Sequence, residues 1–172
     1  MDRGTLTSES LPSGANTYHY AVVDVPGTVA ANNYISLFNP SNSGKTYILL
    51  AMHINNYSVG ASSTANSMVK YRITAASGGS VVATNNIAGY DTTGPTSTAS
   101  IRTGNPTVTT VGPPGMPVSP PIATGAGDNA ENVIHFPAGT YYLIHPGEGV
   151  AYSVAAGNTN QVWTVHLIWC EF

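Results

Sequence analysis

The chain ends in QVWTVHLIWCEF, residues 161–172, and this stretch decides the fold. Successive side chains of a β-strand point to opposite faces, so one face of this stretch carries a row of large apolar residues. That row consists of Trp163, Val165, Leu167 and Trp169. The opposite face also carries apolar side chains, at Val162, Ile168 and Cys170. Two apolar faces predict a central strand of a sheet, or a strand with one face covered by a partner.

Working outward from this strand, the rest of the chain repeats short runs rich in β-branched and aromatic residues, each bounded by Gly, Pro, Asn or Ser. These runs cover 18–25, 34–38, 46–54, 68–74, 81–84, 132–136, 141–145 and 150–155. No window has sustained helical periodicity, and the 18 glycines and 12 prolines would interrupt most helices. The pattern predicts an all-β protein, an antiparallel β-sandwich of jelly-roll or immunoglobulin-like type.

The length of 172 residues fits one domain. Residues 1–17 are small and polar and are expected to form an N-terminal arm, followed by a single sandwich domain at 18–172. Turn residues at 39–44 and 137–139 each separate two apolar runs, and both are interpreted as antiparallel hairpins.

Residues 85–131 are predicted to be a long, irregular, Pro/Gly-rich insertion. Unstructured loops of this length are uncommon and often functional. Prolines favour extended segments that lose little entropy on docking to a surface. We therefore expect an interface with another subunit; the alternative is a mobile surface insertion. The residues assigned to this interface are Pro106, Pro113, Pro114, Pro117, Pro120 and Pro121, together with Trp163 and Trp169.

Charged residues make up only 8% of the chain, against about 25% in an average globular protein. A neutral surface resists association less than a charged one, which favours a homo-oligomer or larger assembly; an extracellular module with a neutral surface is the alternative. The net charge of −3, with five Lys and Arg, argues against binding to nucleic acid or anionic membranes. The first residues contain no apolar signal-peptide core, so synthesis in a cytoplasm is expected.

The segment Ser43-Gly44-Lys45-Thr46 is similar to part of a phosphate-binding loop. The first glycine of that motif is replaced by Asn39, and the following run, 47–54, has the pattern of a strand where the motif requires a helix. A turn explains these residues better than a nucleotide site does.

The histidines at 19, 53, 135, 145 and 166 lack the spacing of a metal-binding motif and are interpreted as isolated structural residues. The eight carboxylates are scattered, and no nucleophile elbow occurs. Cys170, the single cysteine, is expected to be buried and inert. We therefore predict no catalytic residues, no metal and no cofactor, and a protein that is not an enzyme. Most of the ten tyrosines lie in strand patterns, which favours core positions over sugar binding.

Three segments carry a family resemblance: LFNPSNSGK at 37–45, PGEGV at 146–150 and WTVHLIWCE at 163–171. In this order they resemble the small β-sandwich virion proteins of tailed bacteriophages, above all capsid decoration or cement proteins. The resemblance implies a structural role on the capsid surface, a homo-oligomer that is most often a trimer, and contacts with the major capsid protein or other virion proteins. The alternative is a receptor- or carbohydrate-binding module of a phage tail or another extracellular assembly.

Overall fold

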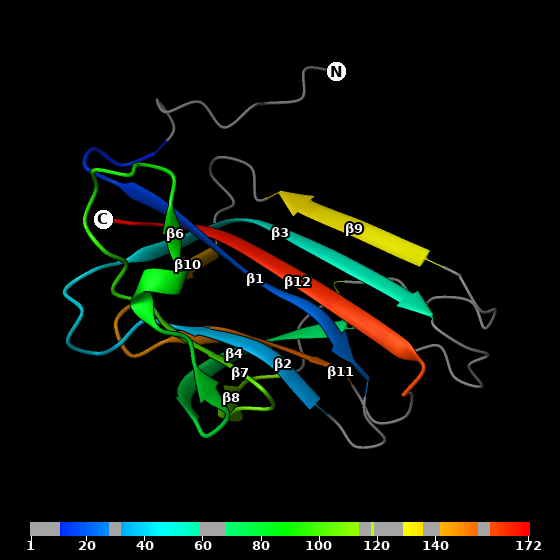
Figure 1. Ribbon diagram of the computed structural model, residues 1–172. Coiled ribbons are helices and arrows are strands. Elements are labelled where there is room, and N and C mark those ends of the chain that lie inside the picture. The colour runs from blue at the N-terminus through cyan, green and yellow to red at the C-terminus, as the bar shows by residue number, and fades with distance from the viewer. Residues whose placement is uncertain are drawn as a thin grey trace.

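The computed structural model describes residues 11–27, 32–58, 68–113, 118, 129–135, 142–154 and 159–172. Its strands form two antiparallel sheets that pack face to face, which confirms the predicted all-β sandwich (Figure 1). The elements are β1 (Asn16–Pro26), β2 (Asn32–Phe38), β3 (Tyr47–Ser58), β4 (Met68–Ser77), β5 (Ser80–Val81), a short 3-10 helix (Thr84–Asn86), β6 (Ala88–Gly89), β7 (Ser100–Thr103), β8 (Thr107–Val111), β9 (Asn129–His135), β10 (Tyr142–Ile144), β11 (Gly149–Val154) and β12 (Gln161–Glu171).

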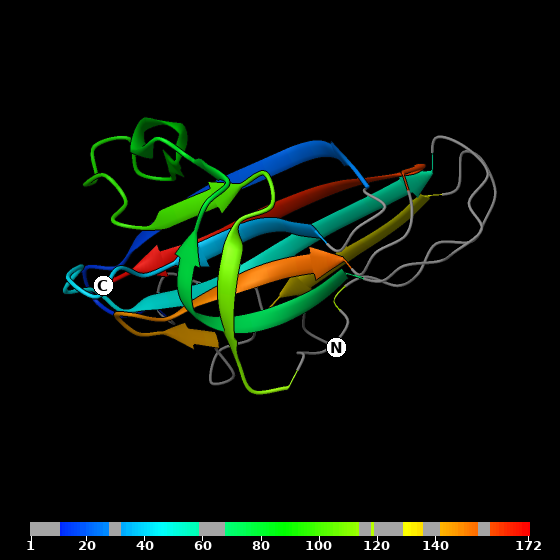
Figure 2. The ribbon, with the colours of Figure 1, turned by 90° about the horizontal axis from the view of Figure 1, so that it is seen from below.

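The first sheet has the order β10-β3-β12-β1-β6, and β9 continues the line of β10 along the same edge of β3. The second sheet has the order β5-β7-β2-β11-β4-β8. Figure 2 shows β4 and β11 of the second sheet in front of β3 and β12 of the first. The nested pairs β1 with β12, β2 with β11, β3 with β10 and β4 with β8 are those of a long hairpin rolled over itself. The fold is therefore a jelly roll and not the immunoglobulin-like alternative.

The C-terminal strand β12 lies between β1 and β3 in the middle of the first sheet, as its two apolar faces predicted. Trp163, Val165, Leu167 and Trp169 are fully buried between the sheets. On the other face Cys170 joins Ile48 and Leu50 in a smaller cluster, and Leu11 and Ala15 pack against it. The two tryptophans therefore belong to the core, and assigning them to an intersubunit surface was wrong.

Cys170 is a free, buried thiol, and burial raises its pKa to about 11. A thiol with such a pKa is almost entirely protonated near neutral pH and is a poor nucleophile. The predicted burial of this residue is confirmed.

The expected arm ends earlier than predicted, because β1 begins at Asn16. Leu11 and Ala15 lie on the first sheet of their own chain, where they cover the cluster around Cys170. Residues 1–10 of the expected arm lie outside the described residues.

The expectation that 85–131 is irregular was wrong for part of its length. β7 pairs with β2 and buries Ile101 completely, while β8 forms the edge of the second sheet beside β4. These strands were missed because they are short, and because an edge strand such as TVTTV at 107–111 needs no apolar face. Residues 114–117 and 119–128 lie outside the described residues.

Both predicted hairpins were also wrong. Residues 39–46 carry the chain from β2 in the second sheet to β3 in the first. The residues at 137–139 lie outside the described residues, but the strands on either side, β9 and β10, both pair with β3 and not with each other. Turn residues indicate where a strand ends, but not which sheet the next strand joins.

Candidate functional site

Four of the five histidines lie in one row across the outer face of the first sheet. They are His19 on β1, His166 on β12, His53 on β3 and His135 on β9, and we call them the histidine row. Neighbouring ring centres are 5.3 Å apart for His19 and His166, 5.5 Å for His166 and His53, and 6.1 Å for His53 and His135. The interpretation of these histidines as isolated residues was therefore wrong.

Strand register creates the row. His53 faces His166 directly across β3 and β12, whereas His19 and His135 lie two residues away from the direct cross-strand position and contact the row diagonally. Diagonal neighbours in a sheet remain within reach when their side chains are rings or long chains. Tyr90 extends the line of rings beyond His19, with ring centres 5.1 Å apart.

The row favours an uncharged imidazole at His166. The pKa of His166 is lowered by partial burial first, and then by the nearby His19 and His53, since a positive charge there would lack water and would face like charges. His19 Nδ1 and His166 Nε2 are 3.2 Å apart, the distance of a hydrogen bond between two rings. Such a bond requires one of the two rings to accept through an unprotonated nitrogen.

The row does not form a metal centre of three or more ligands. Within the described ranges, no three His, Cys, Asp or Glu side chains are placed to hold a metal ion together. The rings follow one another in a line across four strands, whereas a typical zinc site surrounds one point with four ligands.

The short strands at the edges of both sheets carry very little charge. β5, β6, β8 and β10 contain no Asp, Glu, Lys or Arg, and β9 contains Glu131 alone. Apolar side chains are exposed at these edges instead, including Val111 on β8, Val133 on β9 and Leu143 on β10. Natural edge strands are commonly protected from pairing by charges, prolines or bulges. These edges are therefore suited to contact with another protein.

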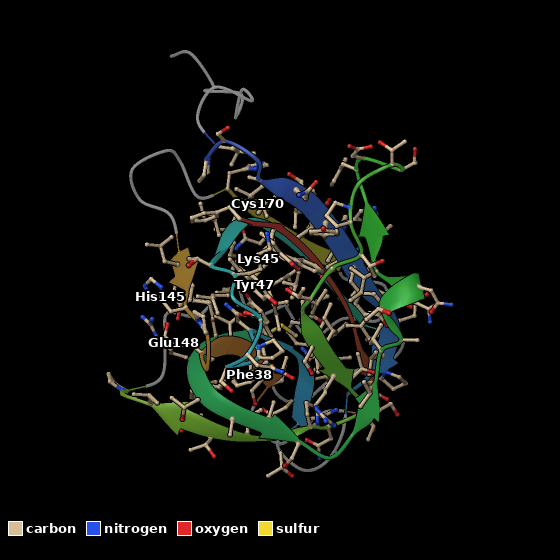
Figure 3. The ribbon with its side chains drawn as sticks, turned by 90° about the vertical axis from the view of Figure 1, so that its left-hand side faces the viewer. Phe38, Lys45, Tyr47, His145, Glu148 and Cys170 are labelled. Carbon is tan, nitrogen blue, oxygen red and sulfur yellow. The ribbon has the colours of Figure 1, made fainter. Side chains whose placement is uncertain are left out.

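Two buried polar residues hold the loops at one end of the sandwich, which Figure 3 views directly. Asn39 is fully buried; its amide donates to the carbonyl oxygens of Lys45 (2.8 Å) and Ile144 (3.1 Å), and its Oδ1 accepts from Ser43 (2.5 Å). The Asn39 backbone also bonds to the turn at 147–148, since its N–H donates to Glu148 and its carbonyl accepts from Gly147. This residue therefore joins the 39–46 crossover to the 145–148 turn.

Glu171, the second of these residues, is buried at the end of β12. Its Oε1 accepts from Ser97 Oγ (2.5 Å) and Trp169 Nε1 (3.1 Å), and its Oε2 accepts from the Thr98 amide (3.0 Å) and hydroxyl (2.8 Å). All of these contacts are structural hydrogen bonds within the chain. They attach the segment before β7 to the first sheet.

Near the same end, Glu148 and Arg72 form an ion pair with an N to O distance of 2.6 Å. Partial burial alone would raise the pKa of Glu148, but the hydrogen bonds from Arg72 and from the His145 amide outweigh it and lower the pKa. The ion pair links β4 to the turn before β11 on a partly exposed surface.

The proline residues assigned to the interface divide into three groups. Pro106 is buried inside its own chain, where its carbonyl accepts a hydrogen bond from Asn33 (2.8 Å), so it does not lie on a free surface. Pro113 is exposed after β8. Pro114, Pro117, Pro120 and Pro121 lie outside the described residues. Within this segment, Val118 is buried and its amide donates to the Met68 carbonyl (2.8 Å), a contact with its own chain.

No helix in the described part of the chain is long and apolar enough to cross a membrane. Neither protein-family models, nor curated proteins, nor solved structures give a match to this chain.

Proposed function

We propose that this chain is a non-enzymatic structural protein that decorates and stabilises a bacteriophage capsid through contacts between subunits. The observation that carries the proposal is the near absence of charge on the exposed sheet edges, where β5, β6, β8, β9 and β10 together contain one acidic residue and no Lys or Arg.

An edge strand presents a row of backbone donors and acceptors that a neighbouring chain is able to bind. Chains that circulate alone block such edges, because open edges lead to aggregation. Here the edges combine open backbone with exposed apolar residues such as Val111 and Val133. In a protein that works inside an assembly, neighbouring subunits cover the sheet edges. Such edges need no charge to prevent unwanted pairing.

Two further observations support this role. Jelly rolls are frequent among viral capsid proteins, although they also occur in lectins, so the fold supports the proposal only by analogy. Two segments of the family resemblance, 37–45 and 146–150, lie against each other, joined by the backbone hydrogen bonds between Asn39 and the 147–148 turn. They form one compact end of the sandwich.

The location of the protein on phage particles tests the proposal. Gold-labelled antibodies against the chain, imaged by negative-stain electron microscopy, should mark the capsid surface. Label confined to the tail tip would replace the proposal with the receptor-binding alternative, and unlabelled particles would overturn both.

A pair of variants tests the role of the edges. Thr109→Lys with Val133→Lys places a charge on β8 and on β9, and should weaken attachment to capsids at least about tenfold, since charges on edge strands oppose pairing. Thr84→Lys with Thr92→Lys adds the same charge at exposed positions outside the sheets and should attach like the unmodified protein. Equal attachment of both variants, measured by co-sedimentation, would show that the edges are not the contact.

A further inference from the structure

Among the described strands that lie wholly at an edge of the first sheet, β9 is the longest. It pairs with β3 on one side, and no described strand lies along its other side. Figure 1 shows β9 at the margin of the sheet, on the far side of β3 from β12. Its outward-facing residues are Glu131, Val133 and His135, which share the outer face with Asn55, His53 and Ala51 of β3.

We propose that β9 pairs with β9 of a second copy of this chain, antiparallel, about a two-fold axis at Val133. The inference rests on the proposed assembly function and names one of its contacts. A two-fold axis perpendicular to the sheet brings the same strand of both copies together, so each contact occurs twice. The first sheets of the two copies then form one continuous sheet.

The match between hydrogen-bond donor and acceptor selects this register. In antiparallel pairing about Val133, Glu131 of each copy lies directly opposite the partner's His135, and the two Val133 side chains meet between these pairs. All of these side chains lie on the same outer face. The imidazole N–H of His135 is a hydrogen-bond donor and the Glu131 carboxylate is an acceptor, so a direct cross-strand pair of the two is complementary.

Neighbouring registers lack this match. An axis at Asn132 places Glu131 opposite the partner's Val133, and an axis at Ile134 places Val133 opposite the partner's His135. Each shift therefore loses both acid–base pairs, and moves Val133 away from its equivalent in the partner. Among the registers centred on 132, 133 and 134, the one at Val133 pairs apolar with apolar and acid with base.

The contact has a consequence for the outer face. The histidine row ends at His135, on the free side of the sheet. Pairing about Val133 places the partner's Glu131 next to that end, so the row in each copy terminates on a carboxylate of the other. A two-fold contact also builds dimers, in place of the trimer that the family resemblance implies.

A charge swap tests this register. The unmodified chain should show a concentration-dependent mass that approaches twice 17.8 kDa in sedimentation equilibrium. Glu131→Lys replaces the accepting carboxylate by an ammonium group, and His135→Glu places two carboxylates opposite each other. Each variant should raise the dissociation constant of the dimer at least about tenfold. The double variant, Glu131→Lys with His135→Glu, places lysine opposite glutamate and should return the dissociation constant to within about threefold of the original.

The position of the contact has its own control. Val133→Lys places two lysines opposite each other and should give a monomer, whereas Val111→Lys, at an equally exposed valine on the edge of the second sheet, should leave the dimer intact. Circular dichroism must show that every variant has the strand content of the original protein. A variant that lacks this strand content is replaced by the neutral Glu131→Gln. Glu131→Gln should weaken the dimer less than Glu131→Lys.

Two results would overturn the inference: a monomer throughout the micromolar range, or a double variant as weak as its parents. Either result leaves the proposed function open to its own test, because antibody labelling of the capsid does not depend on the β9 contact. Conversely, a confirmed dimer without label on the capsid would retain this contact and reject the capsid role.

Discussion

His19 Nδ1 lies 3.2 Å from His166 Nε2, so two neighbouring strands of the first sheet are joined by a hydrogen bond between their histidine rings. The two residues are 147 positions apart in the chain, and the contact exists only when β1 and β12 pair in the observed register. It places an acid-sensitive contact at the centre of the sheet.

The lowered pKa of His166 predicts loss of stability in mild acid. A histidine in an unfolded chain has a pKa of about 6.5, and its folded pKa here is lower, so below about pH 6.5 the unfolded chain binds the proton more readily. The free energy of unfolding should therefore fall as the pH falls from about 6.5 towards the folded pKa, by less than about 1.4 kcal/mol per pH unit because the ring is partly solvated. Urea unfolding between pH 7.5 and 5.0 measures this.

The matched variants are His166→Gln and His145→Gln. His166→Gln removes the central titrating group of the row, so its stability should change less with pH than that of the original protein. His145→Gln alters a histidine outside the row and should retain the original pH dependence. The explanation fails if both variants show the same dependence.

We expect the nearly isosteric change Glu171→Gln to lower the free energy of unfolding substantially, because the Glu171 carboxylate accepts several buried hydrogen bonds. Glu171→Gln replaces one accepting oxygen by a donating amide among four donors, so at least one buried donor loses its partner. The free energy of unfolding should fall by about 2–3 kcal/mol, measured by chemical denaturation. Glu131→Gln, at an exposed position, should change it by less than about 0.5 kcal/mol in dilute protein. A loss at Glu171 no larger than this control would contradict the assigned role.

The Asn39 side chain predicts that the crossover and the 145–148 turn are stabilised together. Asn39→Ala removes two donated hydrogen bonds and one accepted one, and leaves the carbonyl oxygens of Lys45 and Ile144 without this donor. We expect a loss of about 2 kcal/mol in the free energy of unfolding. Hydrogen exchange should become faster at the Gly147 and Glu148 amides, whereas Asn42→Ala, at an exposed position of the same loop, should have little effect on either measurement.

Val118 predicts that the proline-rich segment contributes to the stability of its own chain. Val118→Ala should lower the free energy of unfolding by roughly 1–3 kcal/mol, because the side chain is only 3% exposed and packs in the main core. Val111→Ala, at a valine that is 47% exposed, should lower it by less than about 0.5 kcal/mol. Thermal unfolding followed by circular dichroism compares the two. Equal losses would mean that Val118 is not anchored in the core.

Local patterns predicted more of the fold than of the candidate site. The alternation in β12 was sufficient to place that strand at the centre of a sheet, because alternation depends on neighbouring residues alone. The turn at 39–44 was visible as a break, but its role as a crossover between sheets was not. β8 escaped prediction because Thr and Val on an exposed edge lack the apolar periodicity by which strands are recognised.

The sequence by itself determined the class of the fold, the central place of residues 161–171 and the neutral character of the surface, because these follow from composition and from side-chain alternation along a single strand. Tertiary structure alone decided the jelly-roll order, the burial of Pro106 and Trp163, and the gathering of His19, His53, His135 and His166 into one row. The physical reason is strand register: a shift of one residue reverses every side chain of a strand, and no local pattern specifies the register between segments a hundred residues apart.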